Sequence, residues 1–120
     1  MPPEAQSDRR TASRYAVELD VDCNVEGTYL FASITDISSC GIFVRTAEPL
    51  PQGTQLQLRF GTTPGDARGR IELRGEVVWT TLEPGRSGMG VRFLHASPVD
   101  QRRLLELVRA IAYVDETAGN

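Results

Sequence analysis

Residues 15–25, YAVELDVDCNV, alternate between apolar and polar side chains along their whole length. Side chains of a β-strand point alternately to opposite faces, so this pattern predicts a strand with one face in a core and the other in water. Gly27 ends the strand and begins a turn. The apolar face of the strand consists of Tyr15, Val17, Leu19, Val21, Cys23 and Val25.

Five more strand-like segments follow, bounded by residues typical of turns. They cover residues 28–34, 42–44, 55–60, 71–79 and 89–93. Gly75 predicts a bulge or a point of close approach within its strand. The spacing of the strand aromatics, Tyr15, Tyr29, Phe31 and Phe43, is typical of core residues, and the strand over 71–79 is lined by Ile71, Leu73, Val77 and Trp79.

The periodicity becomes helical near the C-terminus. Ser97 is a favourable N-cap, Pro98 suits the first helical position, and Asp100 completes a pair resembling a capping box. Apolar residues then recur at helical spacing at Leu104, Leu105, Val108, Ile111 and Ala112. We therefore predict an all-β domain with one C-terminal helix, a six-stranded antiparallel barrel whose opening or flank the helix covers. The domain is expected over residues 9–114, between disordered tails at 1–8 and 115–120.

Composition restricts the functional class. The chain has 120 residues, which fits one domain, and its formal net charge of −3 argues against binding of DNA or RNA through a basic surface. All 13 basic residues are arginines, the side chain best suited to planar recognition of phosphate and guanine edges. The two cysteines, Cys23 and Cys40, are too few for a disulfide framework and do not have the spacing of a metal site. We expect both in or near the core. Because no apolar run reaches membrane-spanning length, we expect no membrane insertion and a cytoplasmic location.

Signatures of catalysis are nearly absent from the sequence. His95 is the only histidine, which excludes a site built from several histidines, and we interpret it as structural or solvated. No lysine is present for a Schiff base or a phosphate-binding loop, and Ser38 and Ser39 have no identifiable partner base. We therefore expect no enzyme activity, no metal and no cofactor.

Two groups of residues do carry chemistry. Arg9, Arg10 and Arg14 precede the first strand, and Asp36, Ser38 and Gly41 follow the second. If the two strands pair as an antiparallel hairpin around Gly27, these groups meet at one end of it.

Such a site suits a guanine nucleotide. Arginine matches the O6 and N7 acceptors of guanine and also binds phosphate, whereas Asp36, assisted by Ser38, can accept from the N1–H and N2–H donors. Gly41 permits a left-handed turn or the close approach of a ligand. Taken separately, each group also has an ordinary interpretation, as a solvated tail and as a turn capped by its own side chains.

The sequence resembles the PilZ domain family. Residues 10–14, RTASR, match the RxxxR motif of the family, and residues 36–41, DISSCG, match its [D/N]xSxxG motif. Residues 88–93, GMGVRF, resemble its late-strand GxGVxF signature, and the resemblance extends from about Arg9 to Tyr113.

The resemblance implies a bacterial second-messenger receptor or adaptor module that binds cyclic di-GMP and acts on an unidentified protein effector. It implies a ligand set of Arg10, Arg14, Asp36, Ser38 and Gly41, with Arg9 just ahead. In sites of this kind the residue before RxxxR bears on whether one ligand binds or a stacked pair, and Arg9 favours the pair. Binding is expected to order the arginine-rich segment against the barrel. The alternative is a family member that binds a protein partner and no nucleotide.

Overall fold

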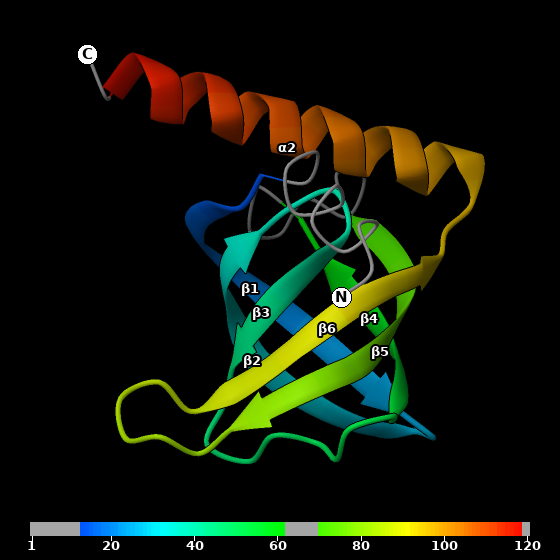
Figure 1. Cartoon of the computed structure of the whole chain (residues 1–120). Helices are drawn as coiled ribbons and strands as arrows, with labels where there is room; N and C mark the ends of the chain where they lie inside the picture. The colour runs from blue at the N-terminus through cyan, green and yellow to red at the C-terminus, as the bar shows by residue number, and fades with distance from the viewer. Residues whose placement is uncertain (1–12, 62–69, 119–120) are drawn as a thin grey trace, which may run out of the picture.

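The computed structural model describes residues 13–61 and 70–118 and has the predicted architecture. Six antiparallel strands close into a barrel in the order β1-β2-β3-β6-β5-β4, and a helix lies across one end of it (Figure 1). No described helix has the combination of length and apolar character needed to cross a membrane. The elements are β1 (Tyr15–Val25), β2 (Thr28–Ile37), β3 (Gly41–Arg45), β4 (Gln55–Phe60), β5 (Ile71–Thr81), β6 (Gly88–His95) and α2 (Pro98–Ala118).

Strands β1 and β2 form the predicted hairpin. Its two-residue turn has positive φ at both central residues, 51° at Glu26 and 87° at Gly27, as the turn type that matches the twist of a hairpin requires. The side chain of Asn24 accepts a hydrogen bond from the N–H of Gly27 at 2.9 Å. At the far end of the hairpin, Ala16 lies opposite Asp36, so the residues before β1 and after β2 meet as predicted.

The core fills the barrel and continues beneath the helix. The inward positions of β1 alternate as predicted, and Val21 and Cys23 are fully buried. Burial raises the pKa of the Cys23 thiol to about 12, with a smaller contribution from the Asp22 carboxylate. Cys40, which we expected near the core, is exposed instead, because it lies in the turn before β3.

Four aromatic residues do not lie where their spacing predicted. The pairing of β5 with β6 shifts between Val77 and Trp79, and this bulge turns the Trp79 ring to the outer face of the barrel. Phe43 also lies outward, between the buried residues Ile42 and Val44. Tyr29 and Phe31 lie outward on β2, because the inward positions of that strand are Leu30, Ala32 and Ile34. The predicted irregularity at Gly75 is confirmed, since a second register shift lies between Arg74 and Gly75.

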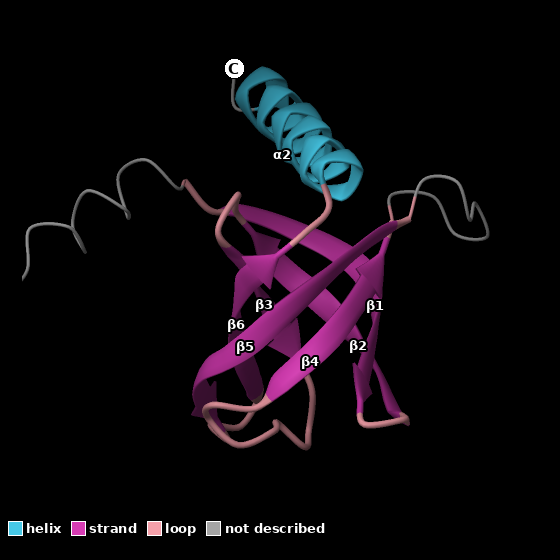
Figure 2. Cartoon of the chain, turned by 90° about the vertical axis from the view of Figure 1, so that its right-hand side faces the viewer, coloured by secondary structure: helices cyan, strands magenta, loops and turns pink. Residues whose placement is uncertain are grey.

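Helix α2 begins at the predicted cap. The Ser97 hydroxyl accepts the N–H of Asp100 at 3.1 Å and donates to its carboxylate at 2.9 Å. The other oxygen of that carboxylate accepts the N–H of Glu72 at 3.2 Å, which ties the start of the helix to β5. The helix lies above one end of the barrel and continues to Ala118, beyond residue 114 (Figure 2).

One of the residues predicted to face the barrel from the helix, Leu105, does not do so, and Leu107 is buried instead. Leu104 and Leu107 are buried, and Val108 and Ile111 pack against the core. Leu105 is 40% exposed, because it lies one helical position away from the buried side. The helix therefore covers the opening of the barrel with Leu107 in the role expected of Leu105.

Candidate ligand-binding site

The two predicted groups meet in an ion pair. Arg14 Nε lies 3.0 Å from Asp36 Oδ1, and both side chains remain substantially exposed. Arg14 directly precedes β1, Asp36 lies near the end of β2, and the hairpin register places the two side by side. Because an exposed ion pair contributes only about 0–1 kcal/mol, an anionic or polar ligand can replace either partner at little cost.

Ser38 holds the turn together from the inside. Its fully buried hydroxyl accepts the N–H groups of Cys40 and Gly41, each at 3.1 Å, and donates to the carbonyl of Gly41 at 3.3 Å. These three bonds use the one donor and both acceptor positions of a hydroxyl. Ser38 therefore shapes the turn beside Asp36, as a turn capped by its own side chain requires, and its contact with a ligand stays a prediction.

Gly41 is required by the packing of β3 on β6. A Cβ atom at this position would lie 2.4 Å from the carbonyl oxygen of Val91, closer than real side chains approach. The φ angle of Gly41 is not positive, so the left-handed turn considered from the sequence does not occur. The backbone of β6 is what approaches Gly41 closely, and the predicted approach of a ligand stays a prediction.

A hollow of about 680 Å³ opens beside the Arg14–Asp36 pair on the outer face of the barrel. Three arginines line it, Arg14, Arg45 and Arg86, together with the carboxylates of Asp36 and Glu83. Thr35, Phe43, Trp79, Thr81 and Gly85 complete the lining. Cations thus outnumber carboxylates in a hollow that also offers aromatic surface.

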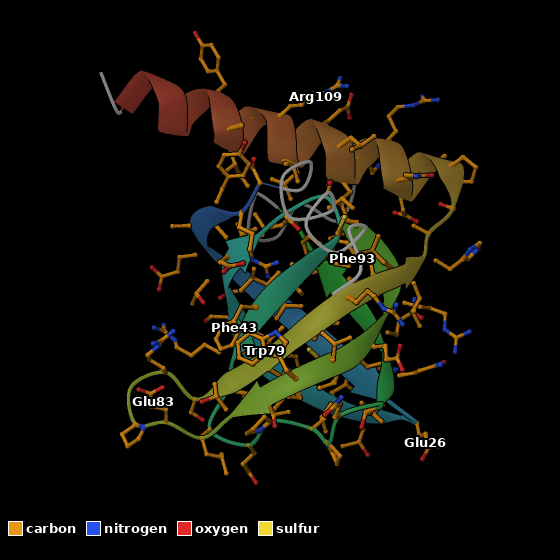
Figure 3. The ribbon with its side chains drawn as sticks, viewed as in Figure 1. Glu26, Phe43, Trp79, Glu83, Phe93 and Arg109 are labelled. Carbon is orange, nitrogen blue, oxygen red and sulfur yellow. The ribbon has the colours of Figure 1, made fainter. Side chains whose placement is uncertain are left out.

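The aromatic surface is a stacked pair of rings. The centroids of Phe43 and Trp79 are 5.3 Å apart with an interplanar angle of 30°, and Trp79 is 47% exposed. Figure 3 shows the two side chains together on the outside of the barrel, next to the loop that carries Glu83. An exposed indole next to arginines is suited to stacking with a nucleobase.

Two glycines of β6 make room for these rings. A Cβ atom on Gly88 would lie 2.6 Å from the Phe43 ring, and one on Gly90 would lie 2.1 Å from Trp79 Nε1. The sequence motif GMGVRF contained these glycines, but its connection to a ligand surface was not predicted. The available signal was that residues 88 and 90 share one face of a strand and both lack a side chain.

A second hollow, of about 940 Å³, lies on the other side of Arg14, between the turn, β6 and the helix. Its polar lining includes Ser39, Arg92, His95 and Gln101, and Arg14 borders both hollows. Arg92 is held by Glu76 at 2.6 Å. His95 is exposed at the end of β6, in agreement with its interpretation as a solvated residue.

Arg9 and Arg10 lie outside the described residues. The described part of the chain holds no group of three or more histidine, cysteine or carboxylate residues placed to bind a metal ion. The charged and exposed aromatic side chains that the structure brings together around the first hollow include Arg14, Asp36, Arg45, Trp79 and Arg86.

Similar folds occur among solved structures. The Bacillus subtilis inhibitor of motility, MotI/DgrA, is 25% identical in sequence and has a TM-score of 0.70. The match covers 92% of this chain and 55% of the MotI chain. The PilZ domain of Escherichia coli YcgR, solved with c-di-GMP, is 16% identical, with a TM-score of 0.67 over 92% of this chain and 97% of its own. The MrkH–c-di-GMP complex of K. pneumonia is 19% identical, with a TM-score of 0.71 over 92% of this chain and 55% of its own.

The chain thus spans about half the length of MotI and MrkH and nearly all of the isolated YcgR domain. Among curated proteins, none is a significant match. The model of the PilZ domain matches residues 8–110, which is most of the sequence and includes both motifs. This chain therefore belongs to the PilZ domain family.

Proposed function

We propose that this protein is a cyclic di-GMP receptor module that binds its ligand in the hollow beside Arg14 and Asp36. PilZ domains are receptor or adaptor domains, and two of the three similar structures described above are complexes with c-di-GMP. The observation that carries the proposal for this chain is the Arg14–Asp36 pair at the border of a hollow that holds two more arginines and an exposed indole.

The ligand offers a matching set of groups. A guanine base stacks on the outer face of Trp79 and contributes about 1–3 kcal/mol. Arg14 leaves Asp36 and donates to the O6 and N7 acceptors of guanine or to a phosphate oxygen. Asp36 is then available to accept from the N1–H and N2–H donors of a base. Arg45 and Arg86 supply further positive charge for the phosphates.

Ligand binding then orders the N-terminal arginines. Arg9 and Arg10 precede Arg14, so the same chain segment can fold over a nucleotide held against the barrel. The charge of the phosphates and the flat faces of the bases drive this ordering. The resulting surface, formed by ligand and arginine segment together, is what a protein effector recognises.

Trp79 provides a direct test, because it is the only tryptophan in the chain. Titration with cyclic di-GMP is expected to quench its fluorescence and to raise the melting temperature in parallel with calorimetric heat. Arg14→Ala is expected to weaken all three signals, whereas Arg59→Ala, on β4 and paired with Asp22, serves as the matched control. If the unmodified protein gives neither heat nor thermal stabilisation at millimolar cyclic di-GMP, the proposal is wrong. The protein is then an adaptor that does not bind the nucleotide.

A further inference from the structure

The first half of β2 carries two exposed aromatic side chains that the ligand site does not use. Tyr29 is 54% exposed and Phe31 is 74% exposed. Their rings are stacked, with centroids 6.4 Å apart and an interplanar angle of 13°. Exposed aromatic surface of this kind is typical of protein interfaces.

The same residues lie on an open edge of the sheet. Strand β3 pairs with β2 only from Ser33 to Ile37, so residues 28–32 extend beyond it. In the tight turn of the hairpin, the N–H of Thr28 is directed to the carbonyl of Val25, and alternate residues of β2 then direct their backbone groups towards β1. The N–H and C=O groups of Tyr29 and Phe31 therefore point away from β1, towards the open edge.

The loop after β3 is attached elsewhere, and among the described strands only β1 pairs with residues 28–32. Thr46 donates to the carbonyl of Ser87 at 3.2 Å, and Gly53 donates to the carbonyl of Val77 at 2.7 Å. These bonds attach the two ends of the loop to the residue before β6 and to the middle of β5. Figure 2 shows the tip of the β1–β2 hairpin as a separate projection at the end of the barrel opposite the helix.

Carboxylates lie at both ends of the aromatic pair. Asp20 is opposite Ser33 on the outer face of β1, and Glu26 lies at the hairpin tip (Figure 3). Within the described residues, neither is part of an ion pair. Asp22, opposite Phe31, is compensated by Arg59 at 3.7 Å and Arg70 at 4.0 Å. On the β3 side, Arg45 lies opposite Ser33 and faces the 81% exposed Glu18 at 3.9 Å.

We propose that residues 28–32 are a docking edge for an extended basic segment of a partner protein, which adds to β2 as a further strand. The backbone groups of Tyr29 and Phe31 supply hydrogen bonds to the added strand. Arginine or lysine side chains at alternate positions of that strand lie over the two rings, in cation–π contact, and reach Asp20 and Glu26. This interaction is separate from nucleotide binding and does not depend on it.

The charge of the surface distinguishes this occupant from a second copy of the chain. Two copies joined through this edge would bring together two surfaces that each carry unpaired carboxylates and would bury only two short strand segments. Stable dimers usually bury more than about 1,200 Å² of surface. A cationic strand instead finds opposite charge, and a small interface suits a transient signalling contact.

The test uses the full chain and a fluorescein-labelled eight-residue peptide with arginine at every second position and threonine or valine between. We expect saturable binding that weakens with salt and is lost when glutamate replaces the arginines. Phe31→Thr keeps a strand-forming residue and is expected to raise the Kd at least about fivefold. Asp20→Asn and Glu26→Asn are each expected to raise it about twofold. Val99→Thr, which removes an exposed apolar residue on the helix, is the matched control.

Two further measurements decide the location and the occupant. Hydrogen exchange of the Tyr29 and Phe31 amides, followed by NMR, is expected to slow when the peptide binds. Binding that is unchanged in Phe31→Thr, or that protects only amides around Arg14, overturns the proposal. Sedimentation of the chain alone is expected to show a monomer; a dimer that Phe31→Thr dissociates identifies a second copy as the occupant and also overturns it.

Discussion

Gly90 and Trp79 are in direct contact across the β5–β6 pair, and a Cβ atom on Gly90 would lie 2.1 Å from the indole nitrogen. The ring therefore lies on the bare backbone of β6 and stacks on Phe43 at its side. One glycine thus positions the aromatic surface of the proposed ligand site, although it contributes no atom of its own to the ligand.

Gly90→Ala is accordingly expected to displace Trp79 and to weaken cyclic di-GMP binding about tenfold or more, through loss of base stacking. Tryptophan emission of the free protein should shift, and calorimetry gives the change in affinity. In a Trp79→Ala background the same substitution should have almost no further effect, because the three nearest atoms to the added methyl group all belong to Trp79. Equal losses in both backgrounds would contradict this account.

Arg14→Ala and Asp36→Ala are each expected to weaken binding at least about tenfold, since charge-assisted contacts contribute about 1.5–3 kcal/mol. Their effect on unfolding should stay below about 1 kcal/mol, because the ion pair between them is exposed. Urea denaturation and calorimetry on the same samples separate the two effects. Normal affinity in both variants would move the ligand to another surface.

Ser38→Ala is expected to act mainly on stability. The substitution leaves the N–H groups of Cys40 and Gly41 without their acceptor beside the buried Ser38 side chain, at a cost of about 1–3 kcal/mol. Urea denaturation measures this cost directly. If instead Ser38→Ala unfolds like the unmodified protein but fails to bind nucleotide, the hydroxyl is a direct ligand contact.

Leu107→Ala and Leu105→Ala form a matched pair on the helix. Leu107 is buried against the barrel, so its truncation is expected to cost about 2–5 kcal/mol. Leu105 is exposed, and its truncation should cost less than about 1 kcal/mol. Thermal denaturation of the two variants ranks them. Similar melting temperatures would mean that the helix does not pack on the barrel as described.

Arg9 is expected to set the stoichiometry of the ligand. A second cyclic dinucleotide adds negative charge close to the first, and a guanidinium at position 9 offers both a counter-charge and a flat stacking surface. We therefore expect two ligands per chain, and a ratio near one for Arg9→Leu with first-ligand binding retained. Calorimetry at protein concentrations well above the Kd reads both ratios. A one-to-one endpoint for the unmodified chain would show that Arg9 takes no part.

Short-range patterns of the sequence were sufficient for the strands, the hairpin turn and the helix cap. Alternation over residues 15–25 specifies which face of β1 is buried, and Ser97 with Asp100 specifies where the helix begins. The meeting of Arg14 with Asp36 also followed from sequence, because antiparallel pairing brings the two ends of a hairpin together. The bulge between Ala16 and Leu19, which shifts the register by one residue, was not predicted.

Only the tertiary structure decided which residues line the candidate site and which part of β2 extends beyond β3. The outward turn of Trp79 depends on a bulge opposite another strand, and its position on β6 depends on a glycine eleven residues along the chain. The burial of Leu107 in place of Leu105 and the half of β2 that extends beyond β3 each depend on an element distant in sequence. Alternation and capping are properties of one segment, whereas bulges, packing faces and open edges are properties of two segments in contact, and no single segment encodes them.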